Sequence, residues 1–450
     1  MRSVLFSLYY FLLALVFISC TRTAVNTVNP LTPPASTDSS HIVKNMTINP
    51  TSGSFNDTVV VSAANITYTD SVMFNGVRGR IVGHLGDSLQ VIVPFLAGPG
   101  PITIAYGSNK ICEGPYFTYN YTSIVITIGG TGQQGSSDAD GIALDATING
   151  PYGVALDQAG NVFVAEAGHP KIRKIGIDGS ISTYAGTGTG GYVDGPGNTA
   201  QFNSPYSIVL DKTGNVYFTD PGNQRIRKID PSGVVSTLAG NGNQGNTDGP
   251  GNMASFHTPF GIAIDPQGNI LVADQGNQLI RKITPAGMVS TLITGPVHQY
   301  MNGKDTTIAG FYGPTGICTD LTGNIFITDA PYVREIITDG TVTSIAGDGN
   351  QGDRDGQGHD AELSYPMGIV CDPKGNIFIS DFGTFKIKQI TSAGNVTTIA
   401  GVRWFDYVTF LDGPALKARF YSPVNIALDK TGNIYVADNN NLRVRKIIIQ

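Results

Sequence analysis

A segment of about 54 residues recurs six times between residue 151 and the last residues of the chain, and this repetition constrains the fold more than any other feature. With few departures the copies follow the pattern P-x-G-[IV]-x-x-D-x-x-G-N-[IV]-[FYL]-[VIF]-x-[DE]. They begin at Pro151, Pro205, Pro259, Pro314, Pro366 and Pro423. Each copy is therefore expected to be one structural unit.

Each copy contains four runs with the character of β-strands. In the first copy they read "GVALD", "NVFVAE", "KIRKI" and "SISTYAG". The Gly-Asn pair between the first two runs indicates a tight hairpin, because Gly160 can take a positive φ without steric cost. Six units of four strands predict an all-β fold with a six-bladed β-propeller over residues 121–450.

These motifs resemble NHL repeats, and the resemblance extends from about Ser123 to the end of the chain. It implies that ligands bind on one particular face of the propeller. That face is made by the linkers entering the inner strands and by the turns between second and third strands; we call it the linker face. The D-x-x-G-N turns lie on the opposite, hairpin face. Linkers can vary without disturbing the strands, which suits them to binding.

The last copy has only three runs, because the chain ends at "NLRVRKIIIQ". A matching fourth run, "SIVITIGGTGQQG" from Ser123, precedes the first copy. We therefore expect residues 123–130 to pair with the terminal strand, to complete the sixth blade and to close the ring. Closure would remove sheet edges that could otherwise pair with other chains.

Residues 41–120 show a different pattern of short alternating runs separated by Gly, Asn and Pro: "TVVVSA", "SVMFNG", "SLQVIVP" and "PITIAYG". Together with "INPTSGSF" and "GPGPITIAYG", these runs resemble an IPT/TIG domain, an immunoglobulin-like β-sandwich. The resemblance implies a spacer module.

The first forty residues predict export and anchoring. Residues 1–20 have one basic residue, an apolar run and a small residue before Cys20, as in a signal peptide. The ending "FISC" resembles the lipobox of bacterial lipoproteins, which implies acylation of Cys20; an ordinary secretory signal is the alternative. Residues 21–40, rich in Thr, Ser and Pro, read as a flexible tether. We expect a protein anchored by lipid in the bacterial cell envelope, at the outer membrane or cell surface.

Charge and cysteine content limit the binding partners and the disulfide bonds that can be expected. The net charge is −6 and no dense Lys/Arg run is present, so nucleic acid is not an expected partner. Beyond Cys20 three cysteines remain, an odd number that cannot pair fully within the chain. Cys318 and Cys371 occupy equivalent runs one position apart, an offset that predicts opposite faces and two small buried residues instead of a disulfide. We expect a monomer.

Two groups of residues are candidates for ligand binding. One lies two places before each repeat-initiating Pro and is expected to ring the mouth of the central channel, where the side chains could equally serve the linker backbone. Its members are Asn149, Asn203, His257, Tyr312, Ser364 and Tyr421. The second is an aromatic linker with Trp404, Phe405 and Tyr407, which could stack on sugars, anchor a protein, or fold back on the propeller.

Other charged residues are expected to be structural. An acid ends the second run of every copy, as Asp220 does, and is predicted to orient the following turn. The Arg and Lys of "IRKI" are predicted to be surface charges. Asp353 and Asp355 imitate part of a calcium loop, but the closing bidentate Glu is missing, so solvated turns are the preferred interpretation.

These patterns favour a non-enzymatic binding protein for a glycan or protein ligand, without cofactor or metal. The alternative is a metal-dependent lyase or lactonase-type hydrolase, as found among six-bladed propellers. Such an enzyme needs convergent His, Asp or Glu in the channel mouth, whereas the predicted ring holds one His, His257, and no carboxylate.

Overall fold

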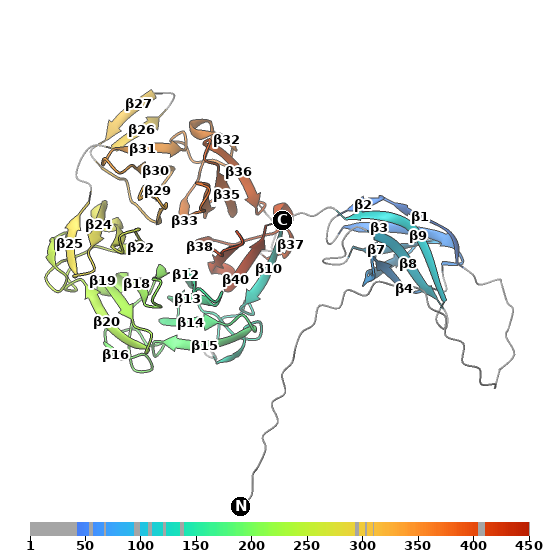
Figure 1. Ribbon diagram of the computed structural model, residues 1–450, viewed down its shortest axis with the longest axis horizontal. Coiled ribbons are helices and arrows are strands. Elements are labelled where there is room, and N and C mark those ends of the chain that lie inside the picture. The colour runs from blue at the N-terminus through green and yellow to red at the C-terminus, as the bar shows by residue number, and fades with distance from the viewer. Residues whose placement is uncertain are drawn as a thin grey trace, which may run out of the picture. The chain divides into compact units, whose positions relative to one another are not determined.

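The computed structural model describes residues 43–53, 57–66, 69–93, 100–106, 110–119, 123–135, 139–292, 297–301, 304–308, 310–403 and 410–449. Over these ranges the chain is all-β, as the repeats predict, with a few short 3-10 helices (Figure 1). None of these helices is long and apolar enough to cross a membrane.

Residues 43–119 form two sheets, with strand orders β1-β3-β7-β6 and β2-β9-β8-β4-β5. All four predicted runs are strands. Alternate residues point inward, as in β8, and the rings of Phe74 and Phe117 meet edge-on at 5.0 Å in the core. The strands are β1 (Lys44–Asn49), β2 (Ser52–Gly53), β3 (Thr58–Ala64), β4 (Thr69–Phe74), β5 (Val77–Arg78), β6 (Arg80–His84), β7 (Ser88–Ile92), β8 (Gly100–Tyr106) and β9 (Lys110–Tyr119).

From residue 123 onward, six antiparallel sheets surround a common centre in a propeller-like arrangement (Figure 1). We number them blade one to blade six in the order of the repeats. In blades one to five the four main strands follow one another outward in chain order from the centre. In the part of the chain that the structure describes, a two-residue strand from the preceding linker is added at the outside of every blade except blade four.

The blades have the following strands. Blade one contains β11 (Gly141–Ile142), β12 (Pro151–Leu156), β13 (Val162–Glu166), β14 (Lys171–Ile175) and β15 (Ser180–Ala185). Blade two contains β16 (Gly195–Pro196), β17 (Ile208–Leu210), β18 (Val216–Asp220), β19 (Arg225–Ile229) and β20 (Val234–Ala239). Blade three contains β21 (Gly249–Pro250), β22 (Pro259–Ile264), β23 (Ile270–Asp274), β24 (Leu279–Ile283) and β25 (Met288–Thr291).

Blade four contains β28 (Ile317–Thr319), β29 (Ile325–Asp329), β30 (Tyr332–Ile336) and β31 (Val342–Ala346), preceded by a hairpin of β26 (Val297–Met301) and β27 (Lys304–Ile308). Blade five contains β32 (Gly356–Gln357), β33 (Pro366–Cys371), β34 (Ile377–Asp381), β35 (Lys386–Ile390) and β36 (Asn395–Ala400). Blade six contains β10 (Ile124–Gly129), β37 (Gly413–Pro414), β38 (Pro423–Leu428), β39 (Ile434–Asp438) and β40 (Arg443–Ile448). The 3-10 helices are η3 (Pro221–Asn223), η4 (Gln275–Asn277), η5 (Gly358–Asp360), η6 (Ala415–Lys417) and η7 (Asn439–Asn441).

Blade six combines strands from far apart in the sequence. Strand β10 pairs antiparallel with β40, with Ile124 opposite Ile448 and Val125 opposite Ile447. It also pairs with β37, and so takes the place that a fourth strand has in the other blades. The expected pairing between residues 123–130 and the terminal strand is therefore present.

The D-x-x-G-N turns are held by their own acid. In blade one Asp157 Oδ1 accepts hydrogen bonds from the N–H groups of Ala159 and Asn161 at 2.9 Å, and Gly160 takes a φ of 92°. Partial burial opposes ionisation of Asp157, but the bonds from Asn161 and Ala159 outweigh it and lower the pKa of this carboxyl. The hairpin signal read in the sequence thus corresponds to a turn whose donors are satisfied locally.

Apolar side chains of each blade pack against the next blade. Val154 and Val164 of blade one, for example, share a buried cluster with Tyr435 and Ala437 of blade six. Because neighbouring blades cover both faces of a sheet, its strands are buried on both sides; all five residues of β13 are buried.

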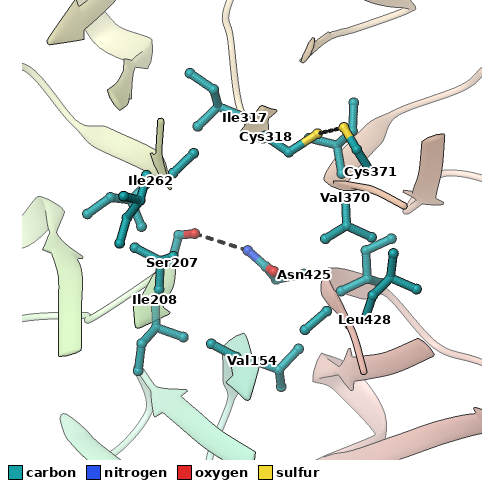
Figure 2. Close-up of a pocket in the computed structure, with 18 of the residues that line it drawn as sticks. Val154, Ser207, Ile208, Ile262, Ile317, Cys318, Val370, Cys371, Asn425 and Leu428 are labelled. Carbon is teal, nitrogen blue, oxygen red and sulfur yellow. Dashed lines mark hydrogen bonds between the residues drawn. The ribbon is translucent and has the colours of Figure 1, made fainter. Parts of the chain in front are cut away.

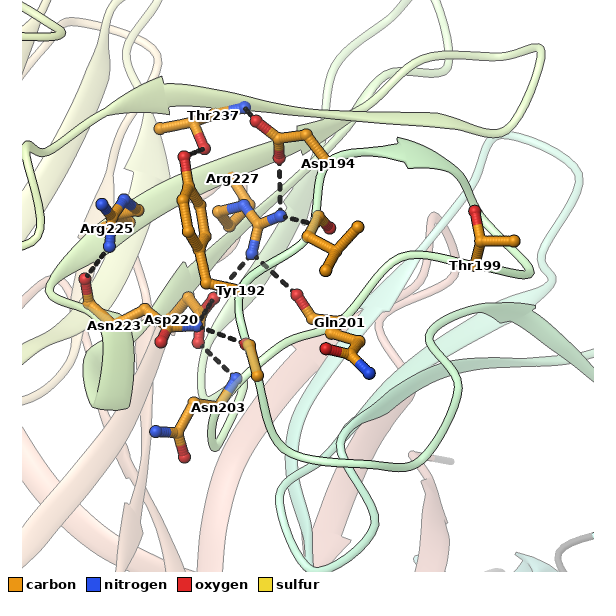
Figure 3. Close-up of polar contacts among 12 residues, drawn as sticks. Tyr192, Asp194, Thr199, Gln201, Asn203, Asp220, Asn223, Arg225, Arg227 and Thr237 are labelled. Carbon is orange, nitrogen blue, oxygen red and sulfur yellow. Dashed lines mark hydrogen bonds and ion pairs between the residues drawn. The ribbon is translucent and has the colours of Figure 1, made fainter.

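One charged residue of each third strand lies in this interior, and the predicted surface position of the "IRKI" arginines is wrong. Arg227 in β19 is fully buried; its Nη1 donates to Asp220 Oδ2 at 2.8 Å and its Nη2 to Asp194 Oδ1 at 2.6 Å (Figure 3). The following Lys228 is only half-buried. A cation is tolerated here because two carboxylates, one from the same blade and one from the preceding linker, neutralise it.

The same arrangement recurs with local changes. Arg281 pairs with Asp274 and Asp248 in blade three, and Arg445 pairs with Asp438 and Asp412 in blade six. In blade five the buried cation is a lysine, Lys388.

The acidic linker of blade five belongs to this system. Asp355 Oδ1 accepts from Lys388 Nζ at 2.7 Å, and Asp353 accepts from Lys386 Nζ at 2.7 Å. Asp355 also accepts a hydrogen bond from the backbone N–H of Thr398. The two carboxylates that resemble a calcium loop therefore bind lysine side chains of their own blade.

The structure places two cysteine side chains closer together than the sequence suggested, although both are free thiols. The Sγ atoms of Cys318 and Cys371 are 2.7 Å apart, on the inner strands β28 and β33 (Figure 2). The offset of one position places the two side chains on opposite faces of their sheets. Because these sheets are neighbouring blades, those two faces pack against each other. Alternation along a strand determines on which face of its sheet a side chain lies. The order of the blades in the ring determines which residues that face contacts.

Candidate ligand-binding site

The six candidate residues that precede the repeat prolines share one backbone contact. Each main-chain N–H donates to the acid that ends the second strand of the same blade, seventeen positions later. The distance is 2.8 Å from Asn203 to Asp220 and 3.3 Å from Asn149 to Glu166. The other four contacts, from His257, Tyr312, Ser364 and Tyr421, measure 2.8 to 3.1 Å. These acids therefore have the structural role predicted for them.

Burial raises the pKa of the five aspartates in this set, which are Asp220, Asp274, Asp329, Asp381 and Asp438. Asp220 is fully buried, and although Asn223, the backbone of Asn203 and Arg227 all favour its charged form, desolvation is the larger effect and the pKa is raised. The Nδ2 of Asn223, in the turn that follows β18, donates to Asp220 at 2.8 Å. One carboxylate thus fixes the linker, the turn and the buried cation together.

The side chains of the candidate residues differ in surroundings. The ring of Tyr312 is 44% exposed and stacks on Tyr332, with centroids 6.3 Å apart, and Tyr421 meets Phe385 edge-on at 5.7 Å. Asn203 is exposed, and a Cβ on Gly222 would collide with it. His257 is half-buried beside Gly276. The buried Asn149 differs from these four because it lines a pocket.

That pocket is a cavity of about 560 Å³ at the junction of blades six and one. It lies on the linker face, between the linker before β12, the turn after β13 and the turn after β39. We call it the amide pocket. Its polar and aromatic lining consists of Gln134, Asn149, Tyr152, His169, Ser204, Asn439 and Asn440.

Hydrogen bonds organise the amide groups of the pocket. Asn149 Nδ2 donates to the carbonyl of Gly135 at 3.1 Å and lies 3.3 Å from Nδ1 of His169. Asn439 Nδ2 donates to the carbonyl of Pro151 at 3.1 Å, and Asn440 Nδ2 donates to Ser422 Oγ at 2.7 Å. The amides are thereby held in place by neighbouring backbone and side-chain groups.

Among the described residues that line the amide pocket, none is Asp, Glu, Lys or Arg. Amides offer both donors and acceptors, and the half-buried ring of Tyr152 offers a face for stacking. Such a lining suits a neutral ligand that carries many hydroxyl or amide groups.

Sequence reasoning identified Asn149 in this site but missed its companions. Tyr152 follows a repeat proline, and its ring lies 4.7 Å from that of Tyr206, which in turn stacks on Phe260 at 4.3 Å. The signal was available for Asn439 and Asn440, because the sixth copy reads "DNNNLR" where the second reads "DPGNQR". No comparable departure marks Gln134.

Several candidates cannot be placed. Trp404, Phe405 and Tyr407 lie outside the described residues, as does Cys20. The neighbouring Phe410 is described, and its ring lies 3.9 Å from the guanidinium of Arg443.

A second cavity of about 300 Å³ lies in the central channel, lined by the inner strands of all six blades. Its walls are mostly apolar, but Asn425 Nδ2 donates to Ser207 Oγ at 3.1 Å inside it (Figure 2). None of the six ring candidates lines this cavity. Over the described ranges, no group of three His, Cys, Asp or Glu side chains is placed to hold a metal ion.

Comparison with known proteins supports the repeat assignment. A family model described as NHL repeat matches residues 420–447. The chain is 27% identical over 333 residues to Protein SUPPRESSOR OF QUENCHING 1, chloroplastic, of Arabidopsis thaliana, covering 72% of this chain and 27% of that protein. It is 26% identical over 335 residues to NHL repeat-containing protein 2 of Homo sapiens, covering 66% and 46%. The chain thus spans less than half the length of these curated relatives.

A solved structure shows a related fold over most of the chain. It is described as an auxiliary nutrient binding protein from Bacteroides thetaiotaomicron VPI-5482; the TM-score is 0.64 and the identity 17%, over 90% of this chain and 98% of that one. At this identity the likeness concerns the fold alone.

Proposed function

We propose that this chain is a lipid-anchored binding protein of the bacterial cell envelope that recognises a glycan on the linker face of its propeller. The observation that carries the proposal is the amide pocket, whose described lining combines three Asn, one Gln and a Tyr ring with no Asp, Glu, Lys or Arg among them. A glycan presents hydroxyl groups and apolar ring faces, and both features find partners there. The fold relative described as a nutrient binding protein is in line with this role.

A protein ligand is the other partner considered, and the pocket argues against it as the main one. Protein interfaces place large apolar or Arg anchors at their centre. The amide pocket contains a single aliphatic side chain of that size, Leu442.

Binding of neutral oligosaccharides on a glycan array tests the proposal. Tyr152→Ala and Asn440→Ala should each weaken binding of the best glycan by roughly tenfold, because each removes one stacking or hydrogen-bonding contact. Gln267→Ala is the matched control, since Gln267 is an exposed amide in a hairpin-face turn of blade three. Equal affinities in all three variants would place the ligand elsewhere.

The aromatic linker belongs to the same proposal, because it too enters an inner strand on the linker face. We propose that Trp404, Phe405 and Tyr407 extend the binding surface. Trp404→Ala should then weaken glycan binding by about tenfold without altering the melting temperature. Affinity that survives Trp404→Ala combined with Tyr421→Ala would remove this linker from the site.

The enzymatic alternative makes a separate prediction. A metal-dependent lyase or lactonase would show turnover that a chelator abolishes. Such turnover, with glycan binding absent, would replace the binding proposal.

Anchoring and spacing complete the proposal. Cys20 would carry the lipid, and residues 21–40 would form the tether. The two sheets of residues 43–119, which we call the first two-sheet unit, would act as an immunoglobulin-like spacer of the IPT/TIG kind. Metabolic labelling with a fatty-acid probe decides the first point: Cys20→Ser should abolish the label. Equal labelling of variant and wild type would rule out acylation of Cys20.

We further propose that β10 closes a six-bladed ring. Its pairing with β40 supports this, because blade six has only three strands of its own from the last repeat. Deletion of residues 123–130 should unfold all the blades in one cooperative transition. A deletion variant with the melting temperature of the wild type would disprove closure by this strand.

A further inference from the structure

We propose that Cys318 and Cys371 form a disulfide bond that joins the inner strands of blades four and five. The inference is independent of the proposed ligand. It starts from the placement of two thiols that are 53 positions apart in sequence and within 2.7 Å in space. The two strands that carry them, β28 and β33, pack side by side at the central channel.

The surroundings favour pairing of these two cysteines with each other. Cys318 is buried in a cluster with Phe326, Val333 and Ile369, and Cys371 packs against the same cluster. Burial raises the pKa of the Cys318 thiol well above its usual range. Cys371 is partly exposed along the channel wall, so it is the sulfur that a reagent in solution reaches first.

The oxidant we name is a small disulfide compound, RSSR. The Cys371 thiolate attacks one sulfur of RSSR, forms a mixed disulfide and releases one RS⁻, which takes up a proton. Cys318, as its thiolate, then attacks Sγ of Cys371 and releases the second RSH. In total the protein loses two hydrogen atoms and RSSR gains them. The two protein thiols become one disulfide, and RSSR becomes two molecules of RSH.

The position gives the bond a structural purpose. Over the described residues, blade four shows no two-residue outer strand like those of the other blades, and its inner strand β28 has three residues whereas β33 has six. A covalent link across the channel wall ties this smaller sheet to its larger neighbour. It restricts the unfolded chain as well, which is the main way in which a disulfide stabilises a protein.

Peptide mapping of the full chain, after treatment with oxidised glutathione, tests the proposal. Without reduction, trypsin should release residues 305–334 and 355–374 as one linked species, about 2 Da lighter than the sum of the two peptides. Cys112, which lies in the first two-sheet unit, should be absent from this species and serves as the internal control. Recovery of the two peptides unlinked, with both thiols alkylated or carrying glutathione, would overturn the proposal.

Thermal unfolding provides the second measurement. The oxidised wild type should melt about 5 °C higher than the reduced wild type. The double variant Cys318→Ala, Cys371→Ala should melt at one temperature with or without reductant, which controls for effects of the reductant elsewhere. Melting of the oxidised and reduced wild type at the same temperature would show that the link does not stabilise the ring.

Discussion

Blades two and four place an arginine at the same buried point of the third strand and neutralise it in different ways. In blade two Arg227 binds Asp220 at 2.8 Å and Asp194 at 2.6 Å. In blade four Arg334 binds Asp329 at 3.0 Å, donates to the hydroxyl of Ser344, and lies over the rings of Tyr332 and Tyr312 at 4.3 and 5.9 Å. Both arginines pair with the acid that ends the second strand of their own blade; Arg227 adds a linker acid, and Arg334 adds a close contact with the ring of Tyr332.

The difference shows which part of the repeat the cation requires. The acid at the end of the second strand binds the linker backbone as well as the arginine, so its loss would leave several groups without partners. The linker acid Asp194 is 38% exposed, and water can take over part of its role. In blade four the arginine also lies close to an aromatic face, 4.3 Å from the Tyr332 ring, and the linker of that blade contains the β26–β27 hairpin.

Removal of the cation should have the largest effect. Arg227→Ala leaves Asp220 buried without its counter-ion, and we expect the free energy of unfolding to fall by about 3–5 kcal/mol. Denaturant titration measures the loss, and Lys212→Ala, at an exposed position of the same blade, is the control of equal charge. A loss no larger than that of the control would mean that the buried pair contributes nothing.

Loss of the aromatic contact in blade four should have the next largest effect. Tyr332 is fully buried, so Tyr332→Leu should lower the free energy of unfolding by about 2 kcal/mol through lost packing and cation–π attraction. Tyr192 lies 5.1 Å from Arg227 in blade two but is 45% exposed, and Tyr192→Leu should cost clearly less. Equal losses in the two variants would contradict the idea that the buried ring of Tyr332 contributes more to its arginine than the exposed ring of Tyr192 does.

The turn acids should behave alike in the two blades. Burial opposes ionisation of Asp211 and Asp320, but hydrogen bonds from Asn215 and Thr213, and from Thr322 and Asn324, lower both pKa values. Each therefore stabilises the fold at neutral pH, and this contribution is lost as the pH falls below the ordinary aspartate pKa of about 3.9. Asp211→Ala and Asp320→Ala should each cost about 1 kcal/mol at pH 7.

Denaturant titrations at neutral and acidic pH measure this behaviour. The difference between wild type and variant should shrink on acidification by the same amount for both turns. A difference that grows with acid, or that appears in only one blade, would contradict the shared role.

The linker acid of blade two should have the smallest effect. Asp194→Asn keeps the shape and removes the exposed charge, so we expect a loss of about 0.5 kcal/mol. Screening should reduce this loss further in 1 M NaCl. A loss comparable to that of Arg227→Ala would mean that the linker acid stabilises the buried arginine far more than its exposure suggests.

The repeats allowed much of this fold to be predicted, because strand period, Gly-Asn turns and regular spacing are local signals. They allowed less of the interior to be predicted. Arg227 follows an apolar residue in an alternating run, and nothing within the run shows that the next blade covers it or that Asp194, 33 positions earlier, reaches it. The short distance between Cys318 and Cys371 could not be foreseen for the same reason.

The candidate site divides in a similar way. Asn149 could be found from its place before a repeat proline, whereas the amide pocket is assembled from turns of two blades at opposite ends of the propeller sequence. His169 and Asn439 belong to different copies, and no spacing rule within one copy relates them.

The pairing of β10 with β40 also sets the order of events while the protein is being made. Arg443 in β40 donates to the carbonyl of Thr131, just after β10, across 312 positions of sequence. At roughly 5–20 residues per second, a ribosome takes about 15 to 60 s to synthesise that interval. Throughout this time β10 exists without the strand it will pair with, while blades one to five can already assemble. Blade six is therefore the last of the six blades to gain all its strands, and β10, the earliest strand of the propeller, can pair only after β40 has been synthesised.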